Sequence, residues 1–342
     1  MLEHAIRRLE AGDSLSAEDA RAAFSVLMTG GFEPERAAAF LLALKRKGET
    51  AVEIAGGVRA LRAALVPVEI PGGPVVDTCG TGGGSLTTFN ISTAAALVVA
   101  GAGARVAKHG NRSFTSRSGS ADVLEALGVA IRVPPELAPA FVERTGFVFL
   151  FAPSYHPAMR HVAPVRRDLG VATAMNLLGP LANPAGVRRQ VVGVADPDRL
   201  DLMAGALCEL GHERALVVHG APGMDECSPL GETSVRVVEH GTVRSHVIRP
   251  GDLGYGPFAA EELAGGEPEE NARIVEAIVR GELGGAARAA VELNAAAALF
   301  AAGVASDLAD GVRRAGTAID GGAAGRVLER LREESRRLSP ET

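Results

Sequence analysis

Hydrophobic residues recur every three to four positions through the first 66 residues, a spacing that predicts amphipathic helices. Ser16 followed by two acids has the pattern of a helix N-cap, and Thr50 with Glu53 has the spacing of a capping box. Pro34 begins another helical stretch, which Gly48 ends. No alternating strand pattern interrupts this region, so we expect a small all-helical domain over residues 1–66. Its apolar faces must pack on the rest of the chain or on a second subunit.

From residue 74 the pattern changes to short β-branched runs that alternate with helical stretches. The predicted strands cover 74–77, 104–107, 148–151, 190–194 and 215–218, and residues 234–248 have the pattern of an antiparallel hairpin. The predicted helices cover 92–102, 120–127, 135–143, 196–210, 259–263, 271–280 and 286–301. Such alternation predicts an α/β unit with a mostly parallel sheet, in which ligands gather where strands end.

The segment from 157 to about 187 does not fit this alternation, because it mixes helical spacing with turns broken by proline and glycine. We expect residues of about 160–187 to rejoin the N-terminal helices, which would make the helical domain discontinuous in sequence. Residues 67–73 contain two prolines and two glycines, a composition typical of a linker. The α/β domain is then expected to cover 67–159 and 188–342.

The composition argues against several classes of protein. A chain of 342 residues with 47% hydrophobic residues has ample material for a core, and its net charge of -6 disfavours a main role in holding nucleic acid or an anionic membrane. The charged N-terminus does not resemble a secretory signal, and no unbroken apolar run reaches the roughly 20 residues of a membrane span. Three cysteines without a CxxC pair fit a reducing, cytoplasmic setting.

Lysine and asparagine are scarce, so each remaining one is informative. Only three of the 35 basic residues are lysines, at positions 45, 47 and 108, and the chain has six asparagines. Lys108, Asn90 and Asn111 lie together between residues 75 and 122, and two more asparagines lie between 176 and 183. This placement indicates that lysine or asparagine is needed at these positions, rather than having remained there by neutral sequence drift.

The stretch 75–122 contains two predicted strand exits that are rich in hydrogen-bond donors. The first carries the glycine loop 80–84 and several hydroxyl and amide side chains up to residue 93, and the second carries the polar run 108–112. Backbone N–H groups, a helix N-terminus and a lysine point charge favour a site for a multiply charged anion. A tight turn and a solvated basic turn are the alternatives, since GTGGG matches neither GxGxxG nor GxxxxGK[ST].

Two further segments carry candidate chemistry. Asp225 and Glu226 follow a predicted strand and turn, and beside a polyphosphate such acids can hold Mg²⁺, although an acidic loop is more often only solvated. The apolar, turn-rich segment 176–184 is interpreted as a hinge or crossover beside the pocket. Arg166 or Arg167 before it could clamp a carboxylate through the planar guanidinium, with two surface arginines as the alternative.

The motifs DTCGTGG, FNIST, AKHGNRS, SGSAD, NLLGPLANP and HG…MDE occur in this order between about Asp77 and Glu226. In their order and spacing the chain resembles the anthranilate phosphoribosyltransferases. The resemblance implies a small helical domain plus a large α/β domain, a substrate site in the cleft between them, and a homodimer formed through helices. It also implies transfer of the phosphoribosyl group of 5-phosphoribosyl diphosphate to the amine of anthranilate, a step of tryptophan biosynthesis, with Mg²⁺ as cofactor.

The resemblance also assigns roles to residues. Those expected to bind 5-phosphoribosyl diphosphate are Gly80, Gly83, Gly84, Thr88, Asn90, Ile91, Ser92, Thr93, Lys108, His109, Gly110, Asn111, Arg112, Ser113, Thr115, Ser116 and Ser120. Those expected to contact anthranilate are Gly80, Asn111, Arg166 and His156, and those expected to hold Mg²⁺ are Ser92, Asp225 and Glu226.

The chain departs from the family pattern at Gly84, where the family usually has aspartate after GTGG. A direct carboxylate contact to the donor is absent there, which puts donor affinity or metal arrangement in question. A pyrimidine nucleoside phosphorylase and a catalytically silent nucleic-acid-binding relative are the alternative functions. The paired acids argue against the first, and the negative net charge argues against the second.

Overall fold

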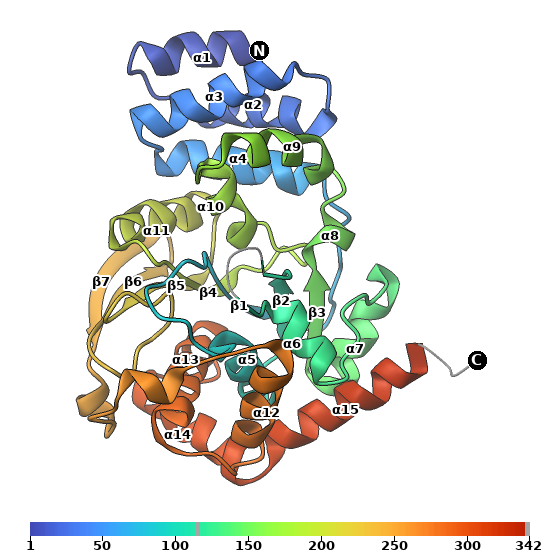
Figure 1. Cartoon of the computed structure of the whole chain (residues 1–342), viewed down its shortest axis with the longest axis vertical. Helices are drawn as coiled ribbons and strands as arrows, with labels where there is room; N and C mark the ends of the chain where they lie inside the picture. Colours follow the sequence, from blue (N-terminus) through green and yellow to red (C-terminus); the bar gives the residue numbers. More distant parts are fainter. Residues whose placement is uncertain (114–116, 339–342) are drawn as a thin grey trace.

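The computed structural model describes residues 1–113 and 117–338, and it begins with four helices (Figure 1). These are α1 (Leu2–Glu10), α2 (Ala17–Thr29), α3 (Pro34–Lys47) and α4 (Ala51–Ala63). Both predicted N-caps are confirmed, because the Asp19 amide donates to Ser16 Oγ over 3.1 Å and the Glu53 amide donates to Thr50 Oγ1 over 3.3 Å. The Thr50 amide donates back to Glu53 Oε2 over 2.8 Å, which completes the capping box. The Glu53 carboxylate is fully buried, where Lys47 Nζ lies 2.7 Å from it. One of the three lysines is thereby accounted for as a structural ion pair.

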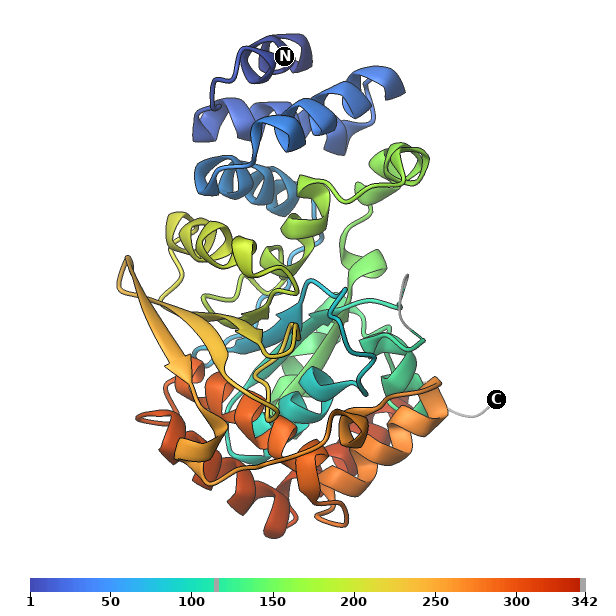
Figure 2. The same cartoon turned by 60° about the vertical axis from the view of Figure 1, so that its left-hand side comes forward.

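The segment between the third and fourth strands returns to these helices. It forms α8 (Ala152–Tyr155), α9 (Met159–Leu169) and α10 (Ala174–Leu181). Helix α9 packs against α2 and α3, and α10 packs against α4, with Val162 and Leu178 fully buried in a core shared with Phe24 and Phe40 (Figures 1 and 2). The structure thus places 159–181 beside the N-terminal helices, while the exact domain boundaries stay a prediction.

The centre of the molecule is a seven-stranded sheet with the order β3-β2-β1-β4-β5-β6-β7. Its strands are β1 (Val76–Gly80), β2 (Val106–Gly110), β3 (Phe147–Phe151), β4 (Arg189–Gly193), β5 (Arg214–Gly220), β6 (Thr233–Glu239) and β7 (Thr242–Ile248). The first five are parallel, and β6 and β7 add an antiparallel hairpin at one edge. The predicted α/β class and mostly parallel sheet are confirmed.

Helices cover both faces of the sheet. The remaining helices are α5 (Ile91–Gly101), α6 (Ser120–Ala126), α7 (Ala138–Thr145), α11 (Leu200–Glu209), α12 (Pro268–Val279), α13 (Gly285–Ala302), α14 (Leu308–Asp320) and α15 (Ala323–Leu338), with short 3₁₀ turns η1 (Pro135–Leu137), η2 (Pro197–Arg199), η3 (Pro250–Leu253) and η4 (Ala260–Leu263). Helix α11 lies between the sheet and α4, whereas α5 and α13 cover the opposite face (Figure 1). In the part of the chain that the structure describes, no helix is long and apolar enough to cross a membrane.

The ends of the first two strands were predicted three residues too early: the first was expected to end at residue 77 and ends at Gly80, and the second was expected to end at residue 107 and ends at Gly110. Lys108, His109 and Gly110 were expected to follow the second strand, but they are its last three residues. Lys108 and His109 are buried within the strand because partners from neighbouring elements satisfy their polar atoms. The strand exit therefore begins at Asn111.

Candidate active site

The largest group of predicted site residues meets at the carboxyl ends of β1, β2 and β4. Strand order reverses between β1 and β4, because β1 is followed along the chain by β2 and β3 on one side while β4 continues to β5 on the other. Open parallel sheets leave a crevice at such a switch point, where loops diverge in opposite directions. Here the crevice is a cavity of about 710 Å³, closed on the opposite side by α9, α10 and the C-terminal end of α3.

Most of the predicted residues line this cavity. They are Gly80, Gly83, Asn90, Ser92, Lys108, His109, Gly110, Asn111, Arg112, Ser113, Ser120, Arg166, Asp225 and Glu226. Five others do not line it, namely Gly84, Thr88, Ile91, Thr93 and His156. Thr115 and Ser116 fall outside the described residues.

The glycine loop and the acidic loop bind each other. Gly82 and Gly83 have φ angles of 70° and 84°, a left-handed conformation in which glycine is unstrained. In this conformation the Gly82 amide donates to Asp225 Oδ2 over 2.8 Å, and the Ser85 amide donates to Gly223 O over 2.8 Å. Two segments 143 residues apart in sequence thus form one wall of the cavity.

Three glycines at neighbouring strand ends make room for the acidic pair. Gly80 ends β1, Gly193 ends β4 and Gly220 ends β5, and Gly80 and Gly193 are paired in the sheet. A Cβ added to Gly193 would lie 1.7 Å from the main-chain oxygen of Asp225, and one added to Gly80 or Gly220 would also collide with the acidic loop. Sequence analysis missed Gly193 and Gly220, since a glycine that ends a strand has no local pattern that points to a ligand site.

The surroundings of the acidic pair disfavour its ionised form. Burial raises the pKa of Asp225, and burial together with the nearby Asp225 charge raises the pKa of Glu226 to about 8. Such shifts mean that the ionised forms need positive charge close by. Among the described residues no cluster of three or more metal-ligating side chains occurs, so a cation here would take few protein ligands. Mg²⁺ binds in this way, through one or two carboxylates, waters and substrate phosphates.

Lys108 is a buried cation beneath this site. Its Nζ donates to Thr78 O over 2.5 Å and to Ser92 Oγ over 3.1 Å, which joins the end of β1 to the first turn of α5. Burial lowers the pKa of Lys108, and the nearby Asp77 carboxylate opposes that shift. The scarcity of lysine correctly marked a residue with a specific position; a direct contact of Lys108 with a phosphate stays a prediction.

Asp77 ties the strands beneath the cavity together. Its carboxylate accepts hydrogen bonds from the His109 amide over 3.1 Å and from Asn183 Nδ2 over 2.9 Å, and Asn183 Nδ2 also donates to Ala107 O. Burial raises the pKa of Asp77 to about 6, against the opposing effect of the Lys108 charge. Asn183, one of the scarce asparagines, therefore anchors the crossover segment to β1 and β2.

His109 and His156 form a buried pair at the edge of the cavity. Their Nε2 atoms lie 3.1 Å apart, and only His109 lines the cavity. Burial lowers the pKa of His109 to about 3 and that of His156 to about 4, so both rings are neutral near pH 7. One imidazole must donate and the other accept, which fixes the orientation of the His109 ring toward the cavity.

The neutral His156 predicts a loss of stability in acid. Its folded-state pKa lies below the ordinary value of 6.5, so its contribution is complete above about pH 6.5 and disappears as the pH falls toward 4. We expect His156→Gln to reduce the fall in unfolding free energy between about pH 7 and pH 4 by up to about 3 kcal/mol. Urea unfolding at both pH values measures this. His240→Gln, at an exposed turn, is the control; an unchanged pH dependence in His156→Gln would show that folding does not lower the pKa of the His156 ring.

Of the adjacent pair Arg166 and Arg167, Arg166 is the one that lines the cavity. It lies in the last turn of α9 and lines the cavity, whereas Arg167 is exposed and does not. Burial lowers the pKa of Arg166, and no acidic partner for its guanidinium lies among residues 1–113 and 117–338. By contrast, Arg112 at the cavity rim is neutralised by Asp122 and Glu125, each 2.6 Å away. An uncompensated guanidinium opposite the glycine loop is suited to a carboxylate ligand.

Several lining residues were not predicted as site residues. The helical side of the cavity contributes Lys45, Glu49 and Asn176, and the β4 exit contributes Asp196 and Arg199, whose guanidinium lies 2.9 Å from Glu49. Lysine scarcity was a usable signal for Lys45. Asparagine scarcity was a similar signal for Asn176. Glu49, Asp196 and Arg199 had no such signal, because their place in the site depends on how the helices pack over the sheet.

Gly84 lies behind the glycine loop against the acidic segment. A Cβ there would meet Gly223 O at 3.2 Å and Asp225 Oδ1 at 3.4 Å. An aspartate at this position would bring a third carboxylate close to the acidic pair. Glycine at position 84 thus leaves out a negative charge beside Asp225. The left-handed backbone that favours glycine occurs in this loop at Gly82 and Gly83, and not at Gly84.

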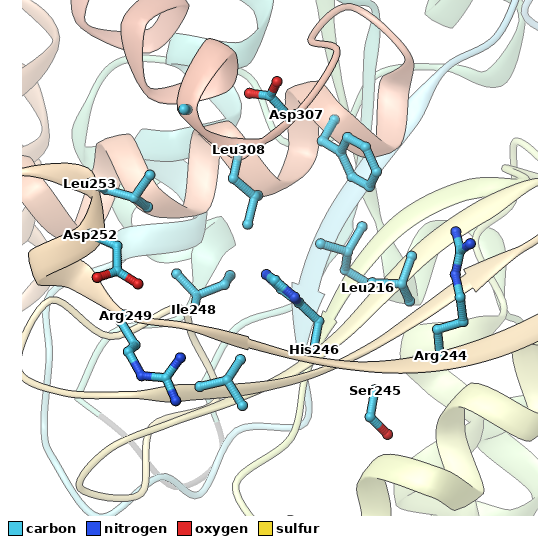
Figure 3. A pocket seen from close by; sticks show the side chains of 14 residues that line it. Leu216, Arg244, Ser245, His246, Ile248, Arg249, Asp252, Leu253, Asp307 and Leu308 are labelled. Carbon is cyan, nitrogen blue, oxygen red and sulfur yellow. The ribbon is translucent and has the colours of Figure 1, made fainter.

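A second cavity, of about 570 Å³, lies between β7 and helices α13 and α14 (Figure 3). Apolar side chains such as Leu216, Ile248 and Leu308 line it together with the polar side chains of His246 and Arg249. None of the predicted site residues that the structure describes lies there. The cavity at the strand ends is therefore the candidate active site.

The chain matches known proteins along nearly its whole length. Residues 72–325 match the α/β domain of a glycosyl transferase family, and residues 3–65 match the helical bundle domain of such a family. A protein of Rubrobacter xylanophilus named anthranilate phosphoribosyltransferase is 50% identical over 339 residues, which cover 99% of this chain and 99% of that protein.

Solved structures agree with this match. The anthranilate phosphoribosyltransferase of Thermus thermophilus has a TM-score of 0.92 and 46% identity, covering 97% of this chain and 99% of that one. The Saccharomyces cerevisiae enzyme in complex with PRPP and Mg has a TM-score of 0.89 and 27% identity, covering 98% of both chains. The same yeast enzyme in complex with 4-fluoroanthranilate has a TM-score of 0.87 and 26% identity, again covering 98% of both.

Proposed function

The chain belongs to the anthranilate phosphoribosyltransferase family, and from that membership we propose how its cavity performs the transfer. The enzyme moves the 5-phosphoribosyl group from 5-phosphoribosyl diphosphate to the amine of anthranilate, giving N-(5-phosphoribosyl)anthranilate and diphosphate in tryptophan biosynthesis. The observation that carries this proposal is the single cavity in which the glycine loop, the acidic pair and the unpaired Arg166 face one another.

The glycine loop and the first turn of α5 are proposed to hold the phosphates of the donor. The Thr81, Gly82 and Ser85 amides already donate to Gly193, Asp225 and Gly223, so the loop offers a ligand the amides of Gly83 and Gly84. Helix α5 begins at Ile91, and Asn90 and Ser92 at its N-terminus line the cavity. A helix N-terminus and successive free amides stabilise negative charge. The rim residues 110–113 and Ser120 would close the site around the ribose phosphate.

Asp225 and Glu226, with the Ser92 hydroxyl, are the residues proposed to hold Mg²⁺. All three line the cavity, and Glu226 also faces the Ser92 amide. Bound there, Mg²⁺ supplies positive charge for the diphosphate as its bond to the anomeric carbon breaks. Lys108 carries its own charge beneath Ser92 and holds that hydroxyl in place.

The acceptor is proposed to lie between Arg166, Asn111 and Gly80. Arg166 would bind the anthranilate carboxylate, which points the aromatic amine at the anomeric carbon. The amine nitrogen forms the new bond as the bond to diphosphate breaks, and then releases a proton. An aromatic amine is already neutral at pH 7, so orientation and electrostatic stabilisation account for catalysis without a dedicated general base. His109, neutral and oriented by His156, lines the same side of the cavity.

Removing the Arg166 guanidinium should therefore weaken the binding of anthranilate far more than the binding of the donor. We expect Arg166→Ala to raise the KM for anthranilate by about 10- to 100-fold, the loss of a charge-assisted contact, while the KM for the donor changes little. Initial rates with each substrate varied in turn measure both constants. Arg167→Ala, at the exposed neighbour, is the matched control. Equal changes in both constants for Arg166→Ala would show that Arg166 is structural.

A homodimer in the cytoplasm is the form proposed for the enzyme. The family resemblance supports a dimer formed through the helical unit, where Phe32 and Leu42 remain partly exposed. Light scattering of the purified protein tests this, since a mass near that of one chain at micromolar concentration would contradict it.

A substrate comparison tests the proposed reaction. The purified protein should convert anthranilate and 5-phosphoribosyl diphosphate to the phosphoribosylated amine, followed by loss of anthranilate fluorescence. It should not cleave thymidine with phosphate. Phosphorolysis of thymidine without consumption of anthranilate would instead identify a nucleoside phosphorylase.

A further inference from the structure

Asn294 is a buried polar residue in the apolar middle of α13. Its neighbours in the helix include Ala290, Ala295 and Ala298, all fully buried, and its own side chain is 3% exposed. Burying an amide costs free energy unless every polar atom finds a partner. An asparagine buried at this position is therefore expected to have hydrogen-bond partners for both its amide oxygen and its amide nitrogen.

That partner is the main chain of Cys227, the residue directly after Glu226. The Cys227 amide donates to Asn294 Oδ1 over 2.9 Å, and Asn294 Nδ2 donates to Cys227 O over 2.8 Å. Asn294 Nδ2 also donates to Ala290 O over 2.9 Å, which fixes the rotamer of the side chain. Two hydrogen bonds to one residue fix both the position and the rotation of the main chain there.

The geometry points to Asn294 as a positioning residue for the Asp225–Glu226 pair, and through that pair for cation binding. The acidic loop is clamped from one side by the Gly82 amide and from the other by Asn294, with the glycine strand ends between them. Groups that orient metal ligands contribute to metal affinity although they do not touch the metal. This inference rests on the proposed Mg²⁺ site.

A second buried asparagine provides a matched control. Asn271, in α12, accepts from the Gly266 amide over 2.8 Å and donates to Asn90 Oδ1 over 2.9 Å. It therefore supports the entry of α5, on the donor side of the cavity, and makes no hydrogen bond to the acidic loop among the described residues. Asn271→Ala and Asn294→Ala remove the same buried group from two helices but act on different walls.

The test is donor binding measured by calorimetry at increasing Mg²⁺ concentration, with thermal unfolding of each variant. We expect Asn294→Ala to raise the Mg²⁺ concentration for half-maximal donor binding by about 10- to 100-fold, and to leave the KM for anthranilate unchanged. Asn294→Ser fills more of the space than alanine and should shift the Mg²⁺ midpoint in the same direction. This variant replaces Asn294→Ala in the test if the alanine variant does not fold. Asn271→Ala should leave the Mg²⁺ midpoint near that of the wild type, even if it weakens donor binding at saturating Mg²⁺.

Two results would overturn the inference. One is an unmoved Mg²⁺ midpoint in folded Asn294→Ala or Asn294→Ser, and the other is an equal shift in Asn271→Ala and Asn294→Ala. Measuring donor binding by the wild type distinguishes failure of this inference from failure of the proposed function. Donor binding by the wild type that does not respond to Mg²⁺ would contradict the metal site itself, whereas a responsive wild type with unresponsive variants would contradict only the role of Asn294.

Discussion

Replacing Asp225 by asparagine together with Glu226 by glutamine is expected to abolish Mg²⁺-dependent turnover, with a fall in kcat/KM of about 1,000-fold or more. Both carboxylates line the cavity beside the glycine loop, and burial raises the pKa of each, so a bound cation would stabilise their ionised forms. The amides keep the shape of the acids but remove both charges. The fold should persist, because no buried cation depends on these two acids as its only partner.

Steady-state kinetics across a range of Mg²⁺ concentrations measure this effect. A double variant of Glu269 and Glu270, both changed to glutamine, removes the same charge from an exposed first helical turn and should retain activity. Full Mg²⁺-dependent activity in the Asp225–Glu226 double variant would mean that the cation binds elsewhere.

Gly193→Ala is expected to cause the second large loss, although Gly193 is not a predicted site residue. The new Cβ would lie 1.7 Å from the Asp225 main-chain oxygen and 2.4 Å from its carbonyl carbon. Main-chain atoms cannot rotate away as a side chain can, so the acidic loop must shift. We expect kcat/KM to fall by about 100-fold and the free energy of unfolding to fall by about 1–3 kcal/mol.

Kinetics and urea unfolding of Gly193→Ala measure the two effects separately. Gly251→Ala is the control, because a Cβ at Gly251 has open space around it and no left-handed backbone to strain. Wild-type kcat/KM in Gly193→Ala would show that the position of the acidic loop does not limit the reaction.

Much of the architecture follows from the sequence pattern, because alternating β-branched runs and helical stretches leave few arrangements besides a mostly parallel sheet. The end of β2 was misplaced for a physical reason. Lys108 and His109 look like loop residues in sequence, and they become buried strand residues only because Thr78, Ser92 and His156 supply partners from elsewhere in the fold. Local pattern carries no information about such partners.

The same distinction holds for the site. The two phosphate-side clusters and the acidic pair carry local signals, and the family resemblance drawn from their motifs is confirmed by relatives that match almost the whole chain. Gly193 and Asn294 act on the main chain of a loop 30 to 70 residues away, so only the structure identifies them. The scarcity of asparagine was a partial signal, since Asn183, Asn271 and Asn294 all proved to hold the walls of the cavity.

The decisive measurement for the proposed Mg²⁺-dependent transfer is the rate of anthranilate consumption by the purified protein with 5-phosphoribosyl diphosphate, with Mg²⁺ and again after the metal is removed by a chelator. We expect rapid formation of phosphoribosylated anthranilate and diphosphate with Mg²⁺, near-complete loss on chelation, and recovery when Mg²⁺ is restored. Equal rates with and without Mg²⁺, or no consumption of anthranilate under either condition, would contradict this proposal.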